Sequence, residues 1–190
     1  MTAANATEHQ DRTVNGSAAG STDPDAGQVD SARFRQTLSR HAAGVTAVTA
    51  LVDGRPVGLT ATSFTSVSAD PPLVSFYVAD TSSTWVRMRR ADRFAVHLLA
   101  DDQGDLATRF ATQGIDRFAP PTRWTTDWNG PPILAGTSAH LVCHRHTTVR
   151  VADHWLVVGR VAKTSIDESK RPLLYLHHTY GRFTPLPRPD

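Results

Sequence analysis

Two long strand-like runs with only two residues between them constrain the fold of this chain more than any other feature. The runs cover residues 138–151 and 154–166, and Ala152 and Asp153 separate them. A connection this short joins antiparallel strands, because parallel strands need a crossover of a dozen or more residues. We therefore predict a long antiparallel hairpin and a fold built around antiparallel sheet.

The remaining segments add strands more often than helices. A second hairpin turns at Asp53-Gly54 within residues 45–63, where β-branched residues alternate along the first strand. Further strands are predicted over residues 71–78, 93–99 and 172–178, helices over 31–44, 82–91 and 101–112, and an irregular loop over 114–132. Because strands and helices do not alternate regularly, a doubly wound parallel sheet is not expected. The prediction is a mainly β fold, a small antiparallel barrel with peripheral helices.

Composition limits the number of domains and the classes of partner. Residues 1–30 are rich in Ala, Thr, Asp, Gly and Ser and have almost nothing to bury, which predicts a disordered tail, followed by one domain over residues 31–190. The single cysteine, Cys143, excludes an internal disulfide and fits a reducing, cytoplasmic setting. No apolar run approaches the roughly 20 residues of a membrane span, and no signal peptide is recognised. A net charge of +2 with scattered basic residues argues against nucleic-acid binding.

Several familiar motifs are missing from the sequence. It contains no G-x-G-x-x-G, no G-x-x-x-x-G-K-[ST] and no G-x-S-x-G, so a Rossmann site, a P-loop and an esterase nucleophile are not expected. His144 and His146 point the same way on a strand, as two metal ligands could, while Cys143 points to the other face. No glutamate follows within a few residues to complete such a site. We expect no metal and interpret both histidines as members of a partly solvated strand face.

The stretch "GLTATSFTSVSADPPLVSF", residues 58–76, is rich in hydroxyls, and its only charge is Asp70. The hydroxyls before that charge belong to Thr60, Thr62, Ser63, Thr65, Ser66 and Ser68. Backbone amides and small hydroxyls that converge on a phosphate can bind an anionic cofactor without Arg or Lys. An edge strand whose outward face is Thr and Ser has the same composition, because β-propensity favours those residues. Composition alone leaves both interpretations open.

A family pattern bears on this choice. Residues 58–76 resemble G-x-T-x-x-[SA]-F-x-S-[VL]-S-x-[DE]-P-P-L-[VL], a pattern of the flavin reductase domain family. The segments "SSTW", "DRFAVHLLADDQGDLATRFA", "DHWLVVGRV" and "PLLYLHHTYGRF" follow in the family's order and approximate spacing. The resemblance extends from about Phe34 to Phe183 and implies an antiparallel split β-barrel. It also implies a homodimer that reduces FMN or FAD with NADH or NADPH and passes reduced flavin by diffusion to a flavin-dependent monooxygenase.

The resemblance also implies roles for particular residues. Those that would line the flavin are Thr60, Ala61, Thr62, Ser63, Phe64, Thr65 and Ser66. Ser82, Ser83 and Thr84, at a helix start, would hold phosphate oxygens. His154, Tyr180 and Arg182 would lie near the nicotinamide, and His154 is the candidate for a catalytic role. His154 as a plain turn residue and Tyr180 as barrel packing are the alternatives, and Trp85 is expected in the core.

The chain departs from the family pattern at three places. Ala152 stands where glycine is usual before Asp153, and His97 stands where asparagine is common. The segment "HHTYGRF" lacks the arginine-glycine pair often found before the tyrosine, which makes the nicotinamide contacts the least determined. Two other functions compete with a reductase. One is an electron-transfer module that holds its flavin permanently, and the other is a pyridoxamine-phosphate-oxidase-like enzyme, whose usual phosphate-binding Arg and Lys are missing from residues 58–76.

Overall fold

The computed structural model describes residues 29–126 and 130–187. The helices are α1 (Ser31–Leu38), α2 (Ser83–Met88) and α3 (Gly104–Ala111). The strands are β1 (Ala43–Gly44), β2 (Thr46–Val52), β3 (Arg55–Ala61), β4 (Thr65–Ala69), β5 (Pro72–Ala79), β6 (Arg93–Leu98), β7 (Trp124–Thr125), β8 (Ile133–Leu134), β9 (Ala139–Val151), β10 (His154–Ile166), β11 (Leu173–Leu176) and β12 (Thr179–Arg182). Within these ranges no helix is both long and apolar enough to cross a membrane. Most of the predicted tail, residues 1–28, and Trp128 of the predicted loop lie outside the described residues.

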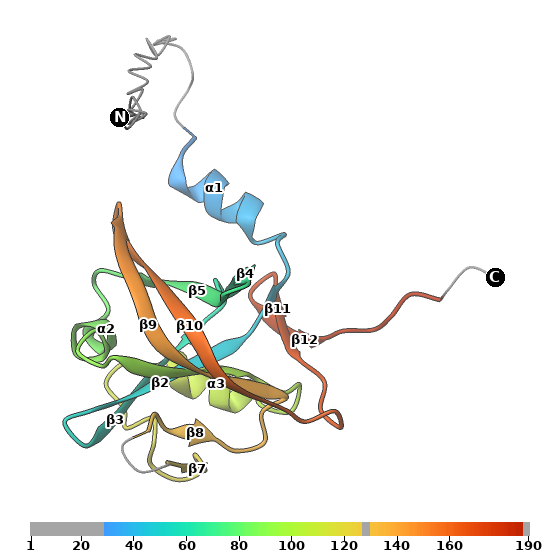
Figure 1. The fold of residues 1–190 in the computed structure, drawn as a ribbon. Coiled ribbons are helices and arrows are strands. Elements are labelled where there is room, and N and C mark those ends of the chain that lie inside the picture. The colour runs from blue at the N-terminus through green and yellow to red at the C-terminus, as the bar shows by residue number, and fades with distance from the viewer. Residues whose placement is uncertain (1–28, 127–129, 188–190) are drawn as a thin grey trace, which may run out of the picture.

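One antiparallel sheet dominates the molecule, with the strand order β3-β2-β6-β9-β10-β5-β4. The sheet curls so that β3 also contacts β5, two strands that are far apart in the ladder (Figure 1). The edge at β4 stays open, and α2 and α3 each pack against β3 and β2. A mainly β split barrel with peripheral helices was predicted, and the structure confirms it.

Both predicted hairpins are present. β9 and β10 pair along almost their whole length, and Ala152 and Asp153 form the tip. Ala152 has φ +51°, the left-handed conformation that the glycine usual at this place adopts without strain. Two register shifts interrupt the ladder, and at one of them Gly159 lies against Phe94, where a Cβ atom would come 2.4 Å from Cζ. Such bulges bend a long strand, which lets this hairpin follow the barrel wall (Figure 1).

The core has two parts. The first fills the barrel between the sheet and α2, where Phe76 and Phe94 pack edge to face at 5.6 Å and Trp85 is buried, as predicted. The second lies between the barrel and α3 and centres on Phe110 and Leu99. Because α2 and α3 each bury side chains in these cores, the helices hold their ends at fixed positions against β3.

Three sequence predictions need correction. The first helix ends at Leu38, and Gly44 lies in β1, where its partner is Leu174. The strand predicted over 172–178 ends at Leu176, because His177 and His178 both have positive φ and turn the chain into β12. The loop over 114–132 contains β7, which pairs with β8.

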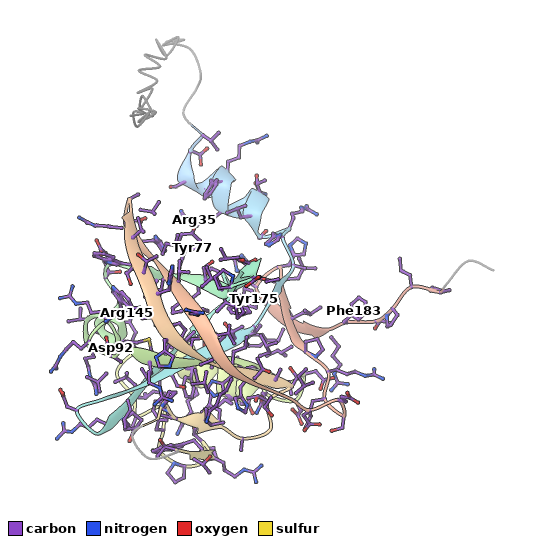
Figure 2. The ribbon with its side chains drawn as sticks, viewed as in Figure 1. Arg35, Tyr77, Asp92, Arg145, Tyr175 and Phe183 are labelled. Carbon is purple, nitrogen blue, oxygen red and sulfur yellow. The ribbon has the colours of Figure 1, made fainter. Side chains whose placement is uncertain are left out.

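α1 and the C-terminal segment both lie outside the barrel. α1 stands apart from it and buries none of its residues, although its N-terminus is well capped by the carboxylate of Asp30 (Figure 1). Phe34 and Leu38, the pair on its apolar face, are each more than half exposed. Phe183 lies on the segment that follows β12 and runs away from the barrel (Figure 2).

Candidate functional site

A cavity of about 270 Å³ opens at the end of β3, between the start of α2 and the segment that follows α3. It brings together residues from three distant parts of the sequence. Its polar lining residues are Thr60, Tyr77, Thr81, Ser82, Ser83, Thr84, Gln113 and Arg117. Four of the predicted flavin residues, Thr60 and the run Ser82–Thr84, therefore share one cavity.

Local hydrogen bonds fix the walls of this cavity. Ser82 Oγ accepts a hydrogen bond from the amide of Trp85 at 3.2 Å and caps α2, as the sequence predicted for Ser82 or Ser83. Thr60 Oγ1 donates to the carbonyl of Ala107 at 2.7 Å and ties β3 to α3. The hydroxyl of Ser83 makes no hydrogen bond with any described residue. It is therefore the hydroxyl of this set that is most available to a ligand.

Arg117 spans the groove between β3 and α2, and sequence reasoning missed it. Its Nη1 donates to the Gly58 carbonyl at 2.7 Å and to Thr84 Oγ1 at 2.6 Å. Its Nε and Nη2 donate to the Thr112 carbonyl at 3.0 and 2.7 Å. No described carboxylate lies within ion-pair distance of this half-buried guanidinium, and burial lowers its pKa. A cation held in this way, without a counter-ion, favours an anionic ligand.

The signal that could have identified Arg117 is weak in the sequence. The residue lies in the region predicted as an irregular loop, among arginines scattered along the chain. Its position depends on the segment after α3 folding back onto Gly58 and Thr84, which a local pattern does not encode. Among the described residues that line the cavity, Arg117 is the only cation.

A second cavity, of about 340 Å³, lies at Thr62 and Ser63, the residues that leave the end of β3. Tyr175 of β11 and His177 of the β11–β12 turn form the opposite wall, and Leu38 at the end of α1 and His41 after it also line the cavity. Ser63 Oγ accepts the amide of Tyr77 at 2.9 Å, so this hydroxyl holds residues 62–64 against β5. The Thr62 hydroxyl makes no hydrogen bond with a described residue.

The remaining members of the predicted stretch point elsewhere. Ala61 is buried, and Phe64 packs against the first core. Thr65 and Ser66 lie exposed on β4, the end strand of the sheet, and line neither cavity. The stretch thus combines both interpretations that its composition left open, since Thr60, Thr62 and Ser63 line cavities and residues 65–69 form an edge strand. A flavin contact at Phe64, Thr65 or Ser66 stays a prediction.

His154 lines neither cavity, but it begins the strand beside the first one. It begins β10 opposite Ala79, a lining residue, and the Asp80 amide donates to the Asp153 carbonyl at 2.9 Å. The His154 ring is about half exposed, and its Nδ1 lies 2.8 Å from the Asp153 carboxylate. That hydrogen bond lowers the pKa of Asp153 and orients the ring at the hairpin tip.

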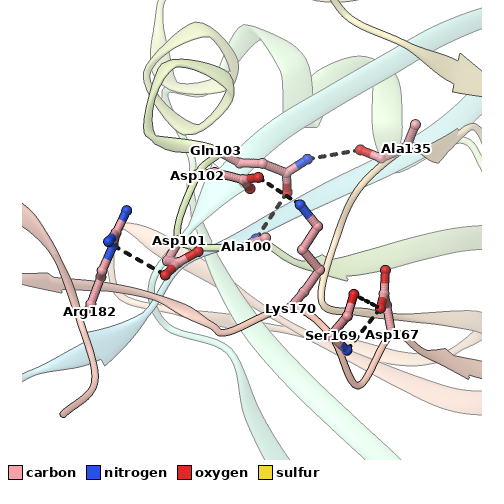
Figure 3. A network of polar contacts seen from close by, with 9 residues as sticks. All are labelled: Ala100, Asp101, Asp102, Gln103, Ala135, Asp167, Ser169, Lys170 and Arg182. Carbon is pink, nitrogen blue, oxygen red and sulfur yellow. Dashed lines mark hydrogen bonds and ion pairs between the residues drawn. The ribbon is translucent and has the colours of Figure 1, made fainter.

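Tyr180 and Arg182 lie on β12, beside the start of α3. The Tyr180 ring packs 5.4 Å from Tyr175 against the second core, as its packing interpretation expected. Arg182 Nε pairs with Asp101 at 3.2 Å, in a polar network that also joins Asp102 to Lys170 at 2.6 Å (Figure 3). Neither Tyr180 nor Arg182 lines the two cavities above. A nicotinamide site shared by these residues and His154 stays a prediction.

The candidate metal ligands do not assemble. His144 and His146 are exposed on β9, and Cys143 is buried on the opposite face, where burial raises its pKa to about 12. In the described part of the chain, no group of three or more His, Cys, Asp or Glu residues is placed to hold a metal ion.

The chemistry of the first cavity suits a phosphate. Hydroxyls of Ser83 and Thr84 and the charge of Arg117 converge there, and no carboxylate lines the cavity to repel an anion. These features suit the phosphate of a phosphorylated ligand such as FMN. No pair of carboxylates is present for acid–base work, which a hydride transfer between two cofactors does not need.

Comparison with known proteins assigns the chain to a family. Residues 38–184 match the family model described as "Flavin reductase like domain". The chain belongs to this flavin reductase family. The match covers every element from the end of α1 to β12, including both cavities.

Relatives within the flavin reductase family include enzymes and subunits of oxygenase systems. An NADH:FMN oxidoreductase of Rhodococcus erythropolis is 43% identical over 157 residues, which cover 80% of this chain and 82% of the relative. The HsaB reductase subunit of a flavin-dependent monooxygenase of Rhodococcus jostii is 38% identical, with coverage of 83% and 80%. The solved structure of the Streptomyces globisporus NADH:FAD oxidoreductase SgcE6 with NAD and FAD fragments is 32% identical, covers 82% of this chain and 94% of that one, and superposes with a TM-score of 0.77.

Proposed function

We propose that this member of the flavin reductase family is an NAD(P)H:flavin oxidoreductase that reduces FMN or FAD. The observation that carries the proposal is Arg117, a half-buried cation without a carboxylate partner among the described residues, beside the hydroxyls of Ser83 and Thr84. The names of the relatives from Rhodococcus and Streptomyces support the same activity. The alternative, an electron-transfer module that keeps its flavin, uses the same cavity.

In this proposal the protein binds and orients two cofactors. When both are bound, the nicotinamide supplies a hydride and the isoalloxazine ring accepts it. Arg117, Ser83 and Thr84 hold the flavin phosphate, and residues 60–63 direct the ring system along the end of β3 toward the cavity at Thr62. His154, which pairs with the lining residue Ala79 and is held by Asp153, is proposed to orient the nicotinamide next to the first cavity. Holding two rings at reacting distance supplies most of the catalytic effect for such a transfer.

The partner of this reductase is proposed to be a separate flavin-dependent monooxygenase that receives reduced flavin by diffusion. Relatives that are reductase subunits of monooxygenases support this role.

We further propose a cytoplasmic homodimer. Support for a dimer comes from exposed apolar residues that a second copy could bury: Phe34 and Leu38 of α1, and Val149 and Val151 near the hairpin tip. The molar mass of the protein in solution tests this.

The proposal is tested by NADH oxidation with desalted protein and added flavin, with FMN and FAD in parallel. We expect a rate that saturates in flavin and is negligible without it. Flavin that stays bound through desalting, together with no turnover of added flavin, would contradict a reductase and favour the electron-transfer module. NADPH in a parallel series separates the two nicotinamide donors.

Replacing His154 with alanine is expected to raise the KM for NADH by about two- to tenfold, the value of one ordinary hydrogen bond. The KM for flavin should change less, because the flavin phosphate lies at Arg117. His146→Ala serves as the control, since His146 is exposed on β9 and lines neither cavity. A larger effect on the flavin KM than on the NADH KM would remove His154 from the nicotinamide side.

A further inference from the structure

A larger cavity, of about 410 Å³, continues the groove beyond Arg117. Thr84 and Arg117 line both this cavity and the first one, so the two share a boundary. This larger cavity follows β3 back from Gly58 to Arg55. At the usual rise per residue of a strand, Arg55 lies about 17 Å from Thr60. A phosphate held at Arg117 therefore lies at the junction, and any group joined to that phosphate has the larger cavity available to it.

The charges of this cavity are unbalanced. Arg55 and Arg87 line it together with Arg117, and no described carboxylate lies within ion-pair distance of any of the three. Asp116 is the one acidic lining residue, and its Oδ1 accepts the amide of Phe118 at 2.9 Å. Nearby Arg90, in contrast, is paired with Asp53 at 2.8 Å. Two unpaired guanidiniums beyond the proposed phosphate site suit a second phosphate, which they can bind through paired hydrogen bonds.

The cavity also offers an apolar surface. Ile115 lines it and is about half exposed, so its side chain is accessible to a ligand in the cavity. An adenine ring can pack on such a side chain while the phosphate next to it meets the arginines. Phosphate-binding cations, an apolar contact and sufficient volume thus occur together on the far side of Arg117.

We propose that Arg55 and Arg87 recognise the adenylate half of flavin adenine dinucleotide and make this chain prefer FAD over FMN. The inference rests on the proposed function, because it takes the flavin phosphate to lie at Arg117. It identifies a specificity site for the flavin substrate: Arg55 and Arg87 bind the second phosphate, and Ile115 contacts the base. FMN lacks both groups and leaves this cavity without a ligand contact.

The test is the equilibrium Kd of FAD and of FMN, measured by flavin fluorescence on the full chain and on Arg55→Gln, Arg87→Gln and the double variant. We expect FAD to bind about tenfold more tightly than FMN to the unmodified chain, the value of a charge-assisted contact. The double variant should lose about that tenfold for FAD and change the Kd of FMN by less than twofold. Arg160→Gln is the control, because Arg160 is exposed on β10 and lines neither part of the groove.

Two outcomes would overturn the proposal: equal changes in the Kd of both flavins, and no change in either. Both would show that the arginines do not recognise the adenylate half. If flavin binding is unchanged and the preference for NADPH over NADH falls, the arginines bind a nicotinamide 2′-phosphate instead. Because Kd needs no turnover, these results stay separate from the oxidation assay, whose failure would contradict the reductase activity and not this specificity site.

Discussion

Replacing Arg117 with glutamine is expected to weaken flavin binding by about tenfold to a hundredfold. The guanidinium is the cation of the first cavity, and losing a charge-assisted hydrogen bond to a phosphate costs roughly 1.5–3 kcal/mol. Glutamine retains some hydrogen bonding but removes the charge. The flavin Kd of Arg117→Lys should fall between those of the unmodified chain and Arg117→Gln. Lysine restores the charge without the planar guanidinium that donates to both Gly58 and Thr84. Fluorescence titration with FMN measures the Kd, and the flavin KM of NADH oxidation should follow it.

The same substitution also removes structural bonds, so binding and folding must be separated. Arg117 donates to three groups on three segments, and the free energy of unfolding from urea titration reports their loss. Arg123→Gln is the matched control, since Arg123 follows in the same segment but lines a different cavity, beside Leu106 and Pro121. If Arg117→Gln lowers stability and leaves the flavin Kd unchanged in folded protein, Arg117 is a structural contact and the phosphate lies elsewhere.

Local chemistry explains why much of the fold could be predicted. Asp53-Gly54 adopts positive φ at both positions, as a two-residue hairpin turn requires, and Asp-Gly is a strong sequence signal for it. Ser82 caps α2 as its side chain predicts. In each case the information lies within a few neighbouring residues, which a sequence pattern can express.

The features that were missed depend on contacts between distant segments or on unusual turn residues. His177 and His178 close the β11–β12 hairpin with positive φ, and histidine carries little signal for such a turn. Phe34 and Leu38 share the apolar face that predicts a packed helix, but α1 contacts no core in one chain.

The candidate site shows the same limit. Its hydroxyls were predicted from two short segments, residues 60–66 and 82–84, whereas Arg117, the charge beside them, comes from a segment that returns to β3 through tertiary structure. Hydroxyls alone suggested a phosphate site without a cation. The fold adds the cation and uses Thr60 and Ser63 to hold its own backbone.

Lowering the pH from 7 to 5 is expected to reduce the free energy of unfolding by about 2 kcal/mol through His97 alone. The side chain is fully buried on β6, Leu134 donates its amide to Nε2 at 3.1 Å, and Nδ1 lies 3.1 Å from the Ala47 carbonyl. This pairing assigns the neutral ring with its proton on Nδ1, because Nε2 must accept. Burial lowers the pKa of His97 to about 3 from its ordinary value of 6.5.

The sign follows from which state binds the proton. Below pH 6.5 the unfolded chain protonates His97, while the folded chain keeps it neutral down to about pH 3. The stability is therefore complete above pH 6.5 and is lost as the pH falls toward 3, with a slope that approaches about 1.4 kcal/mol per pH unit. Urea unfolding at pH 5, 6, 7 and 8 measures this slope.

His97→Asn is the informative variant, because asparagine cannot titrate and is the residue that the family pattern favours at this position. We expect a lower free energy of unfolding at pH 7, because the smaller side chain leaves a cavity and reaches Leu134 less well. Between pH 7 and 5, however, the free energy of unfolding should fall by about 2 kcal/mol less than in the unmodified chain. His144→Asn is the control, because His144 is exposed on β9 and should keep the full fall. An undiminished pH dependence in His97→Asn would mean that other groups drive the acid sensitivity. A reduced one would identify protonation of His97 as a main source of the acid sensitivity, because a protonated ring can no longer accept the Leu134 amide.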